Sequence, residues 1–383
     1  MKRNFRYFIG MLALAIPLCV SAQDNLQQQV NDLEGKVNRM PKISGFVQGM
    51  YLANLNEDGD LIDNTLRMRR VRMSVEGNLA KGLTYKIQGD FSRSPMLVDA
   101  FLKYKPCNEF AIQIGQFKTP FSIESPINPV NLEIFDYGES VQKLVGYSDV
   151  CGVGSLGRDL GIMATGSLFP VETQNGDKFG IVDYSIGVFN GNGANQLDNN
   201  NRKDIVGRLE VHPGLKNLTL SGSYYWGMYK NATIENQIAA NGIAGGVIAF
   251  PNGVRNRWAA GVQYNDGKLV IRGEYLSGET GCKIGALDEQ ANPFIQDITL
   301  YSKGYYAVAG YNFAIGKDKS QKLMPVLRYE HFTTGFPGGN NWYTAGINYW
   351  PIKSLNFKLD YSLVQKESGS NTHRVVGILS YKF

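Results

Sequence analysis

Cysteine and histidine are scarce in this chain of 383 residues, which contains 4 cysteines and 3 histidines. If the residues before position 23 are removed on export, Cys107, Cys151 and Cys282 remain, and such an odd, sparse set does not form a disulfide framework. The histidines are scattered and lack the spacing of a Cys/His metal site. No Ser/His/Asp or Cys/His grouping marks a nucleophile. We therefore predict no metal, no cofactor and no enzymatic activity.

Long hydrophobic runs are also absent after the N-terminal region, where no segment has the roughly 20 apolar residues of a transmembrane helix. Residues 1–22 show the pattern of a secretory signal peptide: basic residues before position 7, an apolar core over 7–20, and a small-residue cleavage site ending at Ala22. Loss of its three basic side chains lowers the formal net charge from +5 to +2. That small charge excludes a nucleic-acid partner.

Residues 23–41 predict a periplasmic coiled-coil arm. Apolar residues recur there at spacings of four and three, which is the seam of a coiled coil. Two heptads are too short to be stable alone, so we expect several copies of the arm to associate; a frayed tether is the alternative. The predicted oligomerisation residues are Leu26, Val30, Leu33, Val37 and Met40.

From residue 43 onward, apolar and polar residues alternate with the two-residue period of β-strands. In the last segment, Leu379, Tyr381 and Phe383 share one face. An aromatic terminus on an alternating segment is typical of the closing strand of an outer-membrane β-barrel. The sixteen segments assigned in this way are 43–55, 66–79, 83–93, 97–105, 110–118, 159–168, 179–190, 203–211, 216–229, 255–265, 268–278, 304–313, 323–333, 342–351, 354–365 and 373–383.

The connections between these segments differ in length by parity. Every second connection is a short turn, such as 80–82, 106–109 or 266–267, whereas most of the others are long. A barrel with both termini in the periplasm predicts this asymmetry, with short turns inside and long loops outside, and a β-sandwich does not. We therefore predict an all-β fold over residues 42–383: a sixteen-stranded antiparallel transmembrane barrel. The long loops are 119–158, 191–202, 230–254 and 279–303.

The alternation also assigns side chains to the two faces of the wall. In segment 354–365, Phe357 and Leu359 face one way, and Lys358 and Asp360 face the other. Apolar-out and polar-in alternation over many strands implies a wet interior. The same parity places Arg67 and Arg69 on the lipid side, at the extracellular rim, where they would reach lipid headgroup phosphates.

Four short motifs resemble the phosphate-selective porin O and P family of Gram-negative outer membranes. The resemblance spans residues 43–383, and it implies a homotrimer of sixteen-stranded barrels in the outer membrane, each a separate pore. The lipid partners would then be outer-membrane lipid and lipopolysaccharide. The motifs are Gly115-Gln116-Phe117-Lys118-Thr119-Pro120-Phe121-Ser122, Gly157-Arg158-Asp159-Leu160-Gly161-Ile162-Met163, Gly187-Val188-Phe189-Asn190-Gly191-Asn192-Gly193 and Gly346-Ile347-Asn348-Tyr349-Trp350.

Parity places a mixture of acids and bases on the inner wall. Several arginines have an acid two positions away on the same face, as in Arg272 and Glu274, about 7 Å along the strand. An anion filter needs a ring of one sign, so this pattern predicts a charge-balanced lumen; structural ion pairs that brace the barrel are the alternative. The predicted pore-lining residues are Arg70, Arg72, Glu76, Lys86, Asp90, Arg208, Glu210, Arg272, Glu274, Arg328, Glu330, Lys358 and Asp360.

The family resemblance implies that the long loop 119–158 folds into the barrel and narrows it. The loop is rich in acids, so we expect an acidic constriction that does not favour phosphate. The predicted constriction residues are Glu124, Glu133, Asp136, Glu139 and Lys143, and Asp149 is a further acid in the loop.

The sequence thus predicts a porin for passive diffusion of small hydrophilic solutes or ions, with weak selectivity. Phosphate or other anions are solutes that the family resemblance implies. The alternative is a surface binding or adhesion protein that uses the barrel as an anchor and loops 230–254 and 279–303 as its binding face. An outer-membrane hydrolase is a third reading, and the lack of a catalytic grouping disfavours it.

Overall fold

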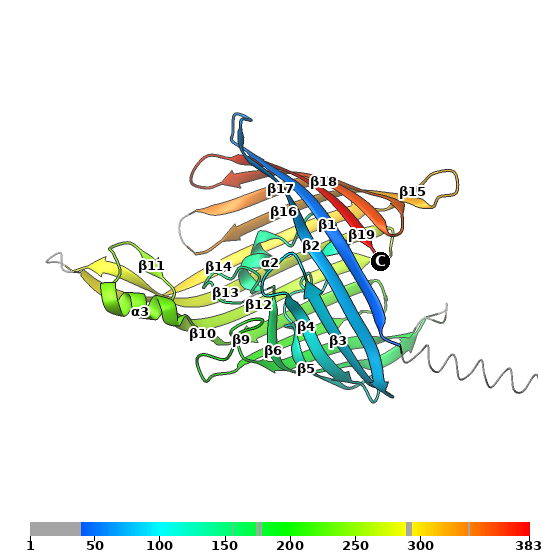
Figure 1. Ribbon diagram of the computed structural model, residues 1–383, viewed down its shortest axis with the longest axis horizontal. Coiled ribbons are helices and arrows are strands. Elements are labelled where there is room, and N and C mark those ends of the chain that lie inside the picture. Colours follow the sequence, from blue (N-terminus) through cyan, green and yellow to red (C-terminus); the bar gives the residue numbers. More distant parts are fainter. Residues whose placement is uncertain (1–39, 155, 174–175, 177, 289–292, 336–337) are drawn as a thin grey trace, which may run out of the picture.

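The computed structural model describes residues 40–383 except 155, 174–175, 177, 289–292 and 336–337. Within these residues, nineteen antiparallel strands form one closed sheet (Figure 1). Three of them are short pieces, β10 (Met228–Lys230), β11 (Ile248–Ala249) and β15 (Phe313–Ile315). The other sixteen build the barrel, as predicted: β1 (Lys42–Leu55), β2 (Leu61–Ala80), β3 (Leu83–Asp90), β4 (Leu97–Tyr104), β5 (Ala111–Lys118), β6 (Arg158–Glu172), β7 (Lys178–Phe189), β8 (Asp204–Val211), β9 (Leu218–Trp226), β12 (Asn252–Asn265), β13 (Leu269–Leu287), β14 (Pro293–Tyr311), β16 (Gln321–Thr333), β17 (Gly339–Ile352), β18 (Leu355–Lys366) and β19 (Thr372–Lys382).

The first and last strands close the barrel. β1 pairs with β19 from Phe46 opposite Lys382 to Leu55 opposite His373. The backbone of Phe383 also exchanges two hydrogen bonds with Gly45, of 2.9 and 3.0 Å. A closed sheet leaves no unpaired edge, which a wall in contact with lipid requires.

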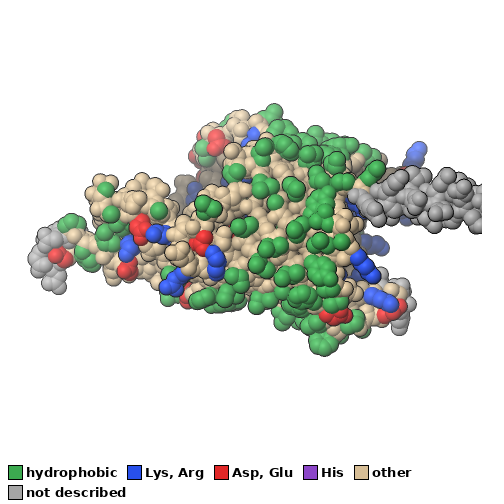
Figure 2. All heavy atoms as spheres, turned by 60° about the horizontal axis from the view of Figure 1, so that its bottom comes forward, with side chains coloured by type: hydrophobic (Ala, Val, Ile, Leu, Met, Phe, Trp, Pro, Cys, Tyr) green, Lys and Arg blue, Asp and Glu red, His purple; other side chains and the backbone are tan. Residues whose placement is uncertain are grey.

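The wall separates apolar from polar side chains by parity, as expected. On β18, Phe357 and Leu359 are 44% and 55% exposed, whereas the intervening Lys358 is 3% exposed. Hydrophobic side chains cover much of the outside of the barrel, with charged side chains nearer its ends (Figure 2). Because polar groups line the inside, the fold suits a water-filled interior in an apolar surround.

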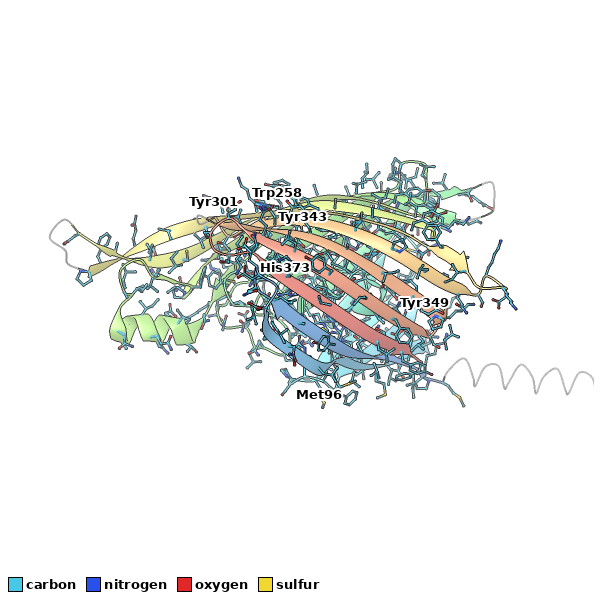
Figure 3. The ribbon with its side chains drawn as sticks, turned by 90° about the horizontal axis from the view of Figure 1, so that it is seen from above. Met96, Trp258, Tyr301, Tyr343, Tyr349 and His373 are labelled. Atoms are coloured by element: carbon cyan, nitrogen blue, oxygen red, sulfur yellow. The ribbon has the colours of Figure 1, made fainter. Side chains whose placement is uncertain are left out.

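Aromatic rings mark the two ends of this apolar band. Trp258, Tyr343 and His373 lie toward one end of the barrel, and Tyr349 lies toward the other (Figure 3). Neighbouring rings on adjacent strands contact each other, as in Tyr329 and Tyr343, whose centroids are 5.1 Å apart. Such girdles sit at the two membrane interfaces.

A β-bulge in β2 overturns the expectation that Arg67 and Arg69 face lipid. Gln48 of β1 pairs with Arg70, but the next residue, Gly49, pairs with Met68, so Arg69 is the extra residue. A bulge inverts the parity beyond it and re-aims side chains. Arg67 therefore stands opposite Met50, which is buried inside, and Arg69 forms an ion pair with Asp136 inside the barrel.

The predicted long loop 279–303 is mostly strand. β13 continues to Leu287 and β14 begins at Pro293, so this hairpin extends beyond the barrel wall. Segment 230–254, which contains helix α3 (Ala232–Asn241), joins it through β11, which pairs with β13. The hairpin and this segment form the extension at the left of Figure 1. Among the described residues, no helix has the length and apolarity to cross a membrane.

The N-terminal predictions mostly lie outside the described residues. These are the signal peptide and the coiled-coil residues Leu26, Val30, Leu33 and Val37. Met40, the last residue of the predicted seam, is described and is 63% exposed.

Candidate pore site

The loop between β5 and β6 folds into the barrel and packs against its inner wall. It carries a 3-10 turn, η1 (Pro129–Asn131), and helix α2 (Glu139–Leu144). Its apolar side chains join inward-facing residues of the wall in one buried cluster, in which Phe121, Leu132 and Leu144 of the loop meet Leu276 and Tyr306 of the wall. This cluster holds the loop inside the barrel, as expected from the family resemblance.

Glu124 is the central ion-pair partner of the loop. Its carboxylate lies 2.6 Å from Nη1 of Arg328 and 3.4 Å from Nη2 of Arg272. Burial by itself would raise the pKa of Glu124, but the two arginines outweigh it and hold the pKa below its usual value. Glu124 is therefore a carboxylate at neutral pH, and it neutralises part of the wall.

Two glutamates of the wall bind the loop backbone. Glu274 accepts hydrogen bonds from Ile123 N and Ser122 Oγ, both 2.8 Å long. Glu330 accepts from Ser140 N at 2.7 Å and from Ser140 Oγ at 2.6 Å. Because Ser140 lies in the first turn of α2 and Gly138 offers no side-chain cap, the carboxylate of Glu330 satisfies a free N–H group at that helix terminus.

Other wall residues hold the rest of the loop. Asp149 accepts from Nη2 of Arg257 at 3.1 Å, and Glu133 forms an ion pair with Arg272 at 2.5 Å. Lys358 donates to the carbonyl oxygens of Leu132 and, at 3.4 Å, Ile134. Asp360 is buried on the same inner face as Lys358. These contacts fix the loop to β12–β18, and Asp136 of the loop also pairs with Arg69 and Arg70 of β2.

These contacts change the expected charge of the constriction. The acids expected to make it acidic have partners, because Glu124, Glu133, Asp136 and Asp149 are all paired with arginines. Glu139 has no ion pair within 4.0 Å among the described residues, and burial raises its pKa. Lys143 is half-buried on the same helix. The carboxylates of the loop thus neutralise the wall behind it.

A cavity of about 390 Å³ lies on the other side of the loop, against β2 to β8. The charged residues that line it are mostly basic: Arg72, Lys86, Lys118, Arg158 and Arg208, with Asp99 as the acid. Lys118 donates to neutral oxygens, including the hydroxyl of Tyr137 at 2.9 Å. Arg158 lies 2.7 Å from Asp99. Basic residues thus outnumber acids in the lining itself, although Arg72, Lys86, Arg158 and Arg208 each have an acid partner.

A second cavity of about 220 Å³ also contains Arg72 in its lining. Arg72 therefore borders both spaces. It forms an ion pair with Asp90 at 2.9 Å.

Of the four arginines that have an acid two or four positions away on the same strand, two form an ion pair with it, as in the alternative of structural ion pairs. Arg208 lies 3.5 Å from Glu210, and Arg328 lies 3.3 Å from Glu330. Arg272 instead binds the loop, and Arg72 pairs across strands with Asp90. Glu76 pairs with Lys86 at 2.7 Å. An arginine and an acid two positions apart on one strand can thus bind an inserted loop instead of each other.

Sequence reasoning missed three basic residues that line the two cavities: Arg69, Lys118 and Arg158. Arg69 was assigned to lipid because parity cannot reveal a bulge. Lys118 and Arg158 lie at the ends of β5 and β6, next to the loop. Both belong to the motifs Gly115–Ser122 and Gly157–Met163, so their place in those motifs was the available signal.

The comparisons with known proteins agree with this geometry. A model of the family described as phosphate-selective porin O and P matches residues 43–383. Comparison with curated protein sequences found no match. Among solved structures, the fold is similar to an anion-selective porin from Comamonas acidovorans, with a TM-score of 0.58 and 12% identity over 90% of this chain and 99% of that chain.

Two further solved structures share the fold. One is the outer membrane channel DcaP of Acinetobacter baumannii, with a TM-score of 0.56 and 12% identity over 90% of this chain and 97% of that chain. The other is the trimer form of OmpT, an outer membrane protein of Vibrio cholerae, with a TM-score of 0.53 and 11% identity over 90% of this chain and 100% of that chain. The fold and the family point to a channel rather than an enzyme. The protein is a channel of the Gram-negative outer membrane, and the chain belongs to the phosphate-selective porin O and P family.

Proposed function

We propose that the channel conducts small hydrophilic anions in preference to cations. The observation that carries this proposal is the unequal charge of the interior. The cavity of about 390 Å³ is lined by five basic residues and one acid. A passage bordered by one sign of charge, with low-dielectric walls, raises the local concentration of the opposite ion.

The position of the loop explains how a lumen with many acids can prefer anions. Its carboxylates bind the arginines of β12, β13 and β16. Asp136 reaches Arg69 and Arg70 of β2, but no carboxylate of the loop lies in the lining of the cavity of about 390 Å³. The similarity in fold to a porin described as anion-selective supports the proposal.

Reversal potentials in planar bilayers test this selectivity. Purified protein is inserted between two potassium chloride solutions of different concentration, where the two ions have similar mobilities in free solution. The expected potential has the sign of chloride permeation, and its size should fall as ionic strength rises, because salt screens the wall charges. A potential of the opposite sign would refute the anion preference and leave the porin assignment intact.

We also propose that the protein is a homotrimer whose subunits meet at β3 to β5. Each of these strands has 8 residues. At a tilt of about 45° such a strand rises roughly 19 Å, less than an apolar band about 25 Å tall. Its outward side chains are mainly aliphatic, including Ile87, Leu102 and Ile114. A sector too short to span the bilayer is suited to contact with another subunit, and the related fold of OmpT is described in a trimer form.

Two proposals concern the remaining partners. The N-terminal arm, residues 23–41, would reinforce the trimer through its coiled-coil seam after the signal peptide is removed. Outer-membrane lipid, with lipopolysaccharide in the outer leaflet, would contact the aromatic wall from β12 to β18. The rings of Trp258 and Tyr275, 5.1 Å apart, are placed as an interfacial girdle there.

A surface-binding role is the second candidate function, and one observation favours it. The hairpin of β13 and β14 is 19 residues long on each side, and it carries α3 and β11 beyond the barrel. Deletion of residues 232–241 tests this role. A binding protein would lose its partner while conductance is unchanged; a channel without such a role would show no binding phenotype.

A further inference from the structure

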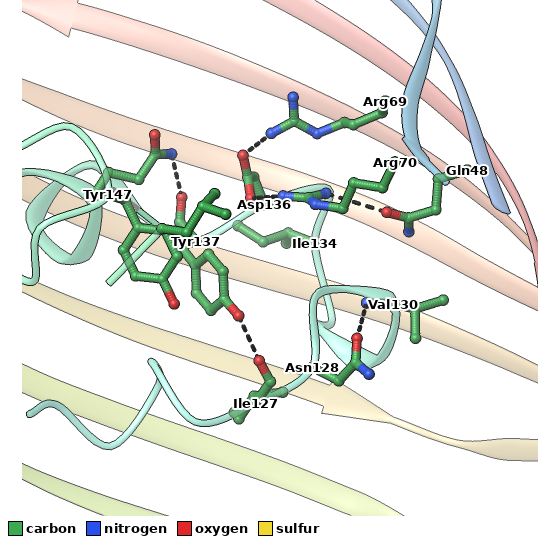
Figure 4. Close-up of polar contacts among 12 residues, drawn as sticks. Gln48, Arg69, Arg70, Ile127, Asn128, Val130, Ile134, Asp136, Tyr137 and Tyr147 are labelled. Atoms are coloured by element: carbon green, nitrogen blue, oxygen red, sulfur yellow. Dashed lines mark hydrogen bonds and ion pairs between the residues drawn. The ribbon is translucent and has the colours of Figure 1, made fainter. Parts of the chain in front are cut away.

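Two consecutive arginines of β2 bind the same carboxylate (Figure 4). Asp136 of the loop places Oδ1 2.8 Å from Nη2 of Arg70, and its Oδ2 pairs with Arg69. In a regular strand, consecutive side chains point to opposite faces. Here Arg69 is the extra residue of the β-bulge, so both guanidinium groups reach the interior. We call this pair the Arg69–Arg70 claw.

The claw has a rigid support. Arg70 donates from Nη1 to Oε1 of Gln48 at 3.2 Å, and Gln48 in turn donates to Oγ of Ser380 at 3.1 Å. Gln48 and Ser380 are both fully buried on strands β1 and β19. The wall thus gives Arg70 a hydrogen bond that does not involve the loop.

Space and positive charge remain beside the claw when Asp136 is bound. The adjoining cavity of about 220 Å³ is lined by four arginines and two acids: Arg69, Arg70, Arg72, Arg93, Asp90 and Asp136. The Nε atom of Arg69 is buried and has no hydrogen-bond partner among the described residues. A donor without an acceptor in a basic cavity indicates room for a further anionic group.

Asp136 presents to the claw the chemical group that a solute anion would present. Two carboxylate oxygens on two guanidinium groups form the arrangement by which arginines bind carboxylate and phosphate. The next residue, Tyr137, fixes this part of the loop, because its hydroxyl donates to Ile127 O at 2.5 Å and its ring packs on Tyr147 at 4.5 Å. The contacts of Tyr137 thus hold the carboxylate of Asp136 in position at the claw.

We propose that Asp136 is a specificity-determining residue that competes with solute for the Arg69–Arg70 claw. It occupies the claw in the absence of solute, and a solute with a carboxylate or phosphate group binds there by displacing it. This inference rests on the proposed anion preference. Its consequence is weak binding of many oxyanions, because each must exchange for a carboxylate already in place, and weak binding permits rapid release.

Block of the chloride current measures this competition. Inorganic phosphate and citrate are added separately to wild type, D136N, E139Q and R69Q in planar bilayers. D136N should lower the half-blocking concentration of both anions about tenfold, because a charged competitor is removed. E139Q removes the same charge from the same loop, away from the claw, and should change block less than about twofold. R69Q should raise the half-blocking concentration.

The outcomes separate this inference from the proposed function. If wild type prefers chloride but D136N and E139Q have the same half-blocking concentrations, the competition is refuted. The anion preference then stands. If wild type prefers potassium, the anion preference itself fails. A response of D136N to phosphate alone would identify phosphate groups as the displacing solute, and a response to citrate alone would identify carboxylates. If D136N forms no channels, R69Q decides the question. A half-blocking concentration in R69Q equal to that of wild type would refute anion binding at the Arg69–Arg70 claw.

Discussion

The carboxylate of Glu124 lies 2.6 Å from the guanidinium of Arg328, which joins the inserted loop to strand β16. Both side chains are at most 1% exposed, and Arg272 of β13 adds a second contact at 3.4 Å. A pair in this setting differs from a surface ion pair, because loss of one partner leaves a buried charge with fewer partners and no water to replace them. The position of the loop therefore depends strongly on Glu124.

Substitution of Glu124 by Gln should release the loop. We expect the docked state to lose less than the about 3–5 kcal/mol of a fully uncompensated buried charge, because Arg328 retains Glu330 and Arg272 retains Glu133. Single-channel recordings should show larger conductance and more frequent current fluctuations than wild type. E139Q is the matched control, since it removes a loop carboxylate that has no described ion pair. Equally frequent current fluctuations in E124Q and E139Q would contradict the role of Glu124 in holding the loop.

Two substitutions in one ion pair should shift selectivity in opposite directions. Arg158 and Asp99 lie 2.7 Å apart and line the same cavity. D99N leaves an additional uncompensated positive charge there and should increase the anion preference; R158Q should decrease it. Reversal potentials in a salt gradient measure both. If the two variants shift in the same direction, the cavity is not the ion pathway.

Acid should break the ion pairs of Glu124 and Asp149 only well below neutral pH. Burial raises the pKa of Glu124 and of Asp149, but the arginines beside them outweigh it, so both pKa values lie below their usual range. A lowered folded pKa contributes stability that is present above the unfolded pKa, about 4, and is lost as pH falls through the folded value. Burial raises the pKa of Glu139, so that carboxyl gains its proton at higher pH.

Conductance recorded as a function of pH checks this order. The current fluctuations that come from loss of the Glu124 and Asp149 ion pairs should increase only below about 4. In E124Q the fluctuations should already be present at neutral pH. Fluctuations in E124Q that begin only at the same low pH as in wild type would contradict the role of the Glu124 carboxylate.

The strands could be predicted because one rule, alternation of apolar and polar residues, acts along nearly the whole wall. Lys358 and Phe357 fall on the expected faces for this reason. The rule fails where the backbone departs from a regular ladder. At Arg69 a single inserted residue reverses the parity, and nothing in the residue types of β2 marks the insertion.

The pairing of charges could not be predicted because it depends on the inserted loop. Arg272 and Glu274 are two residues apart on one face, so sequence reasoning treats them as partners. In the structure the loop supplies Glu124 and Glu133 to Arg272, and it supplies Ser122 and Ile123 to Glu274. A contact between residues about 150 positions apart has no signature in local spacing.

Gly138 should not tolerate a side chain. A Cβ atom there would collide with the guanidinium of Arg328 and the carboxylate of Glu330. We expect G138A to weaken docking of α2 by about 1–3 kcal/mol through overpacking, seen as a lower temperature of loop release in conductance recordings. Gly222→Ala is the control, because no atom lies within 4 Å of its Cβ position. Equal behaviour of the two variants would show that α2 does not rest against Glu330.

Bulk added to the short-strand sector should disrupt the trimer without harming the barrel. Ile114 of β5 and Ile347 of β17 both point outward and are 53% and 41% exposed. β5 has 8 residues, whereas β17 has 14, so only β17 is long enough to face lipid along its length.

Ile114→Trp should therefore convert the trimer to monomers, because a larger ring does not fit a packed interface. Ile347→Trp should remain trimeric, because lipid accommodates the ring. Size-exclusion chromatography with light scattering in detergent gives the oligomeric state, and circular dichroism checks that both barrels are folded. Dissociation by Ile347→Trp but not by Ile114→Trp would move the interface to the opposite side of the barrel. Intact trimers in both variants would exclude Ile114 from a tightly packed contact.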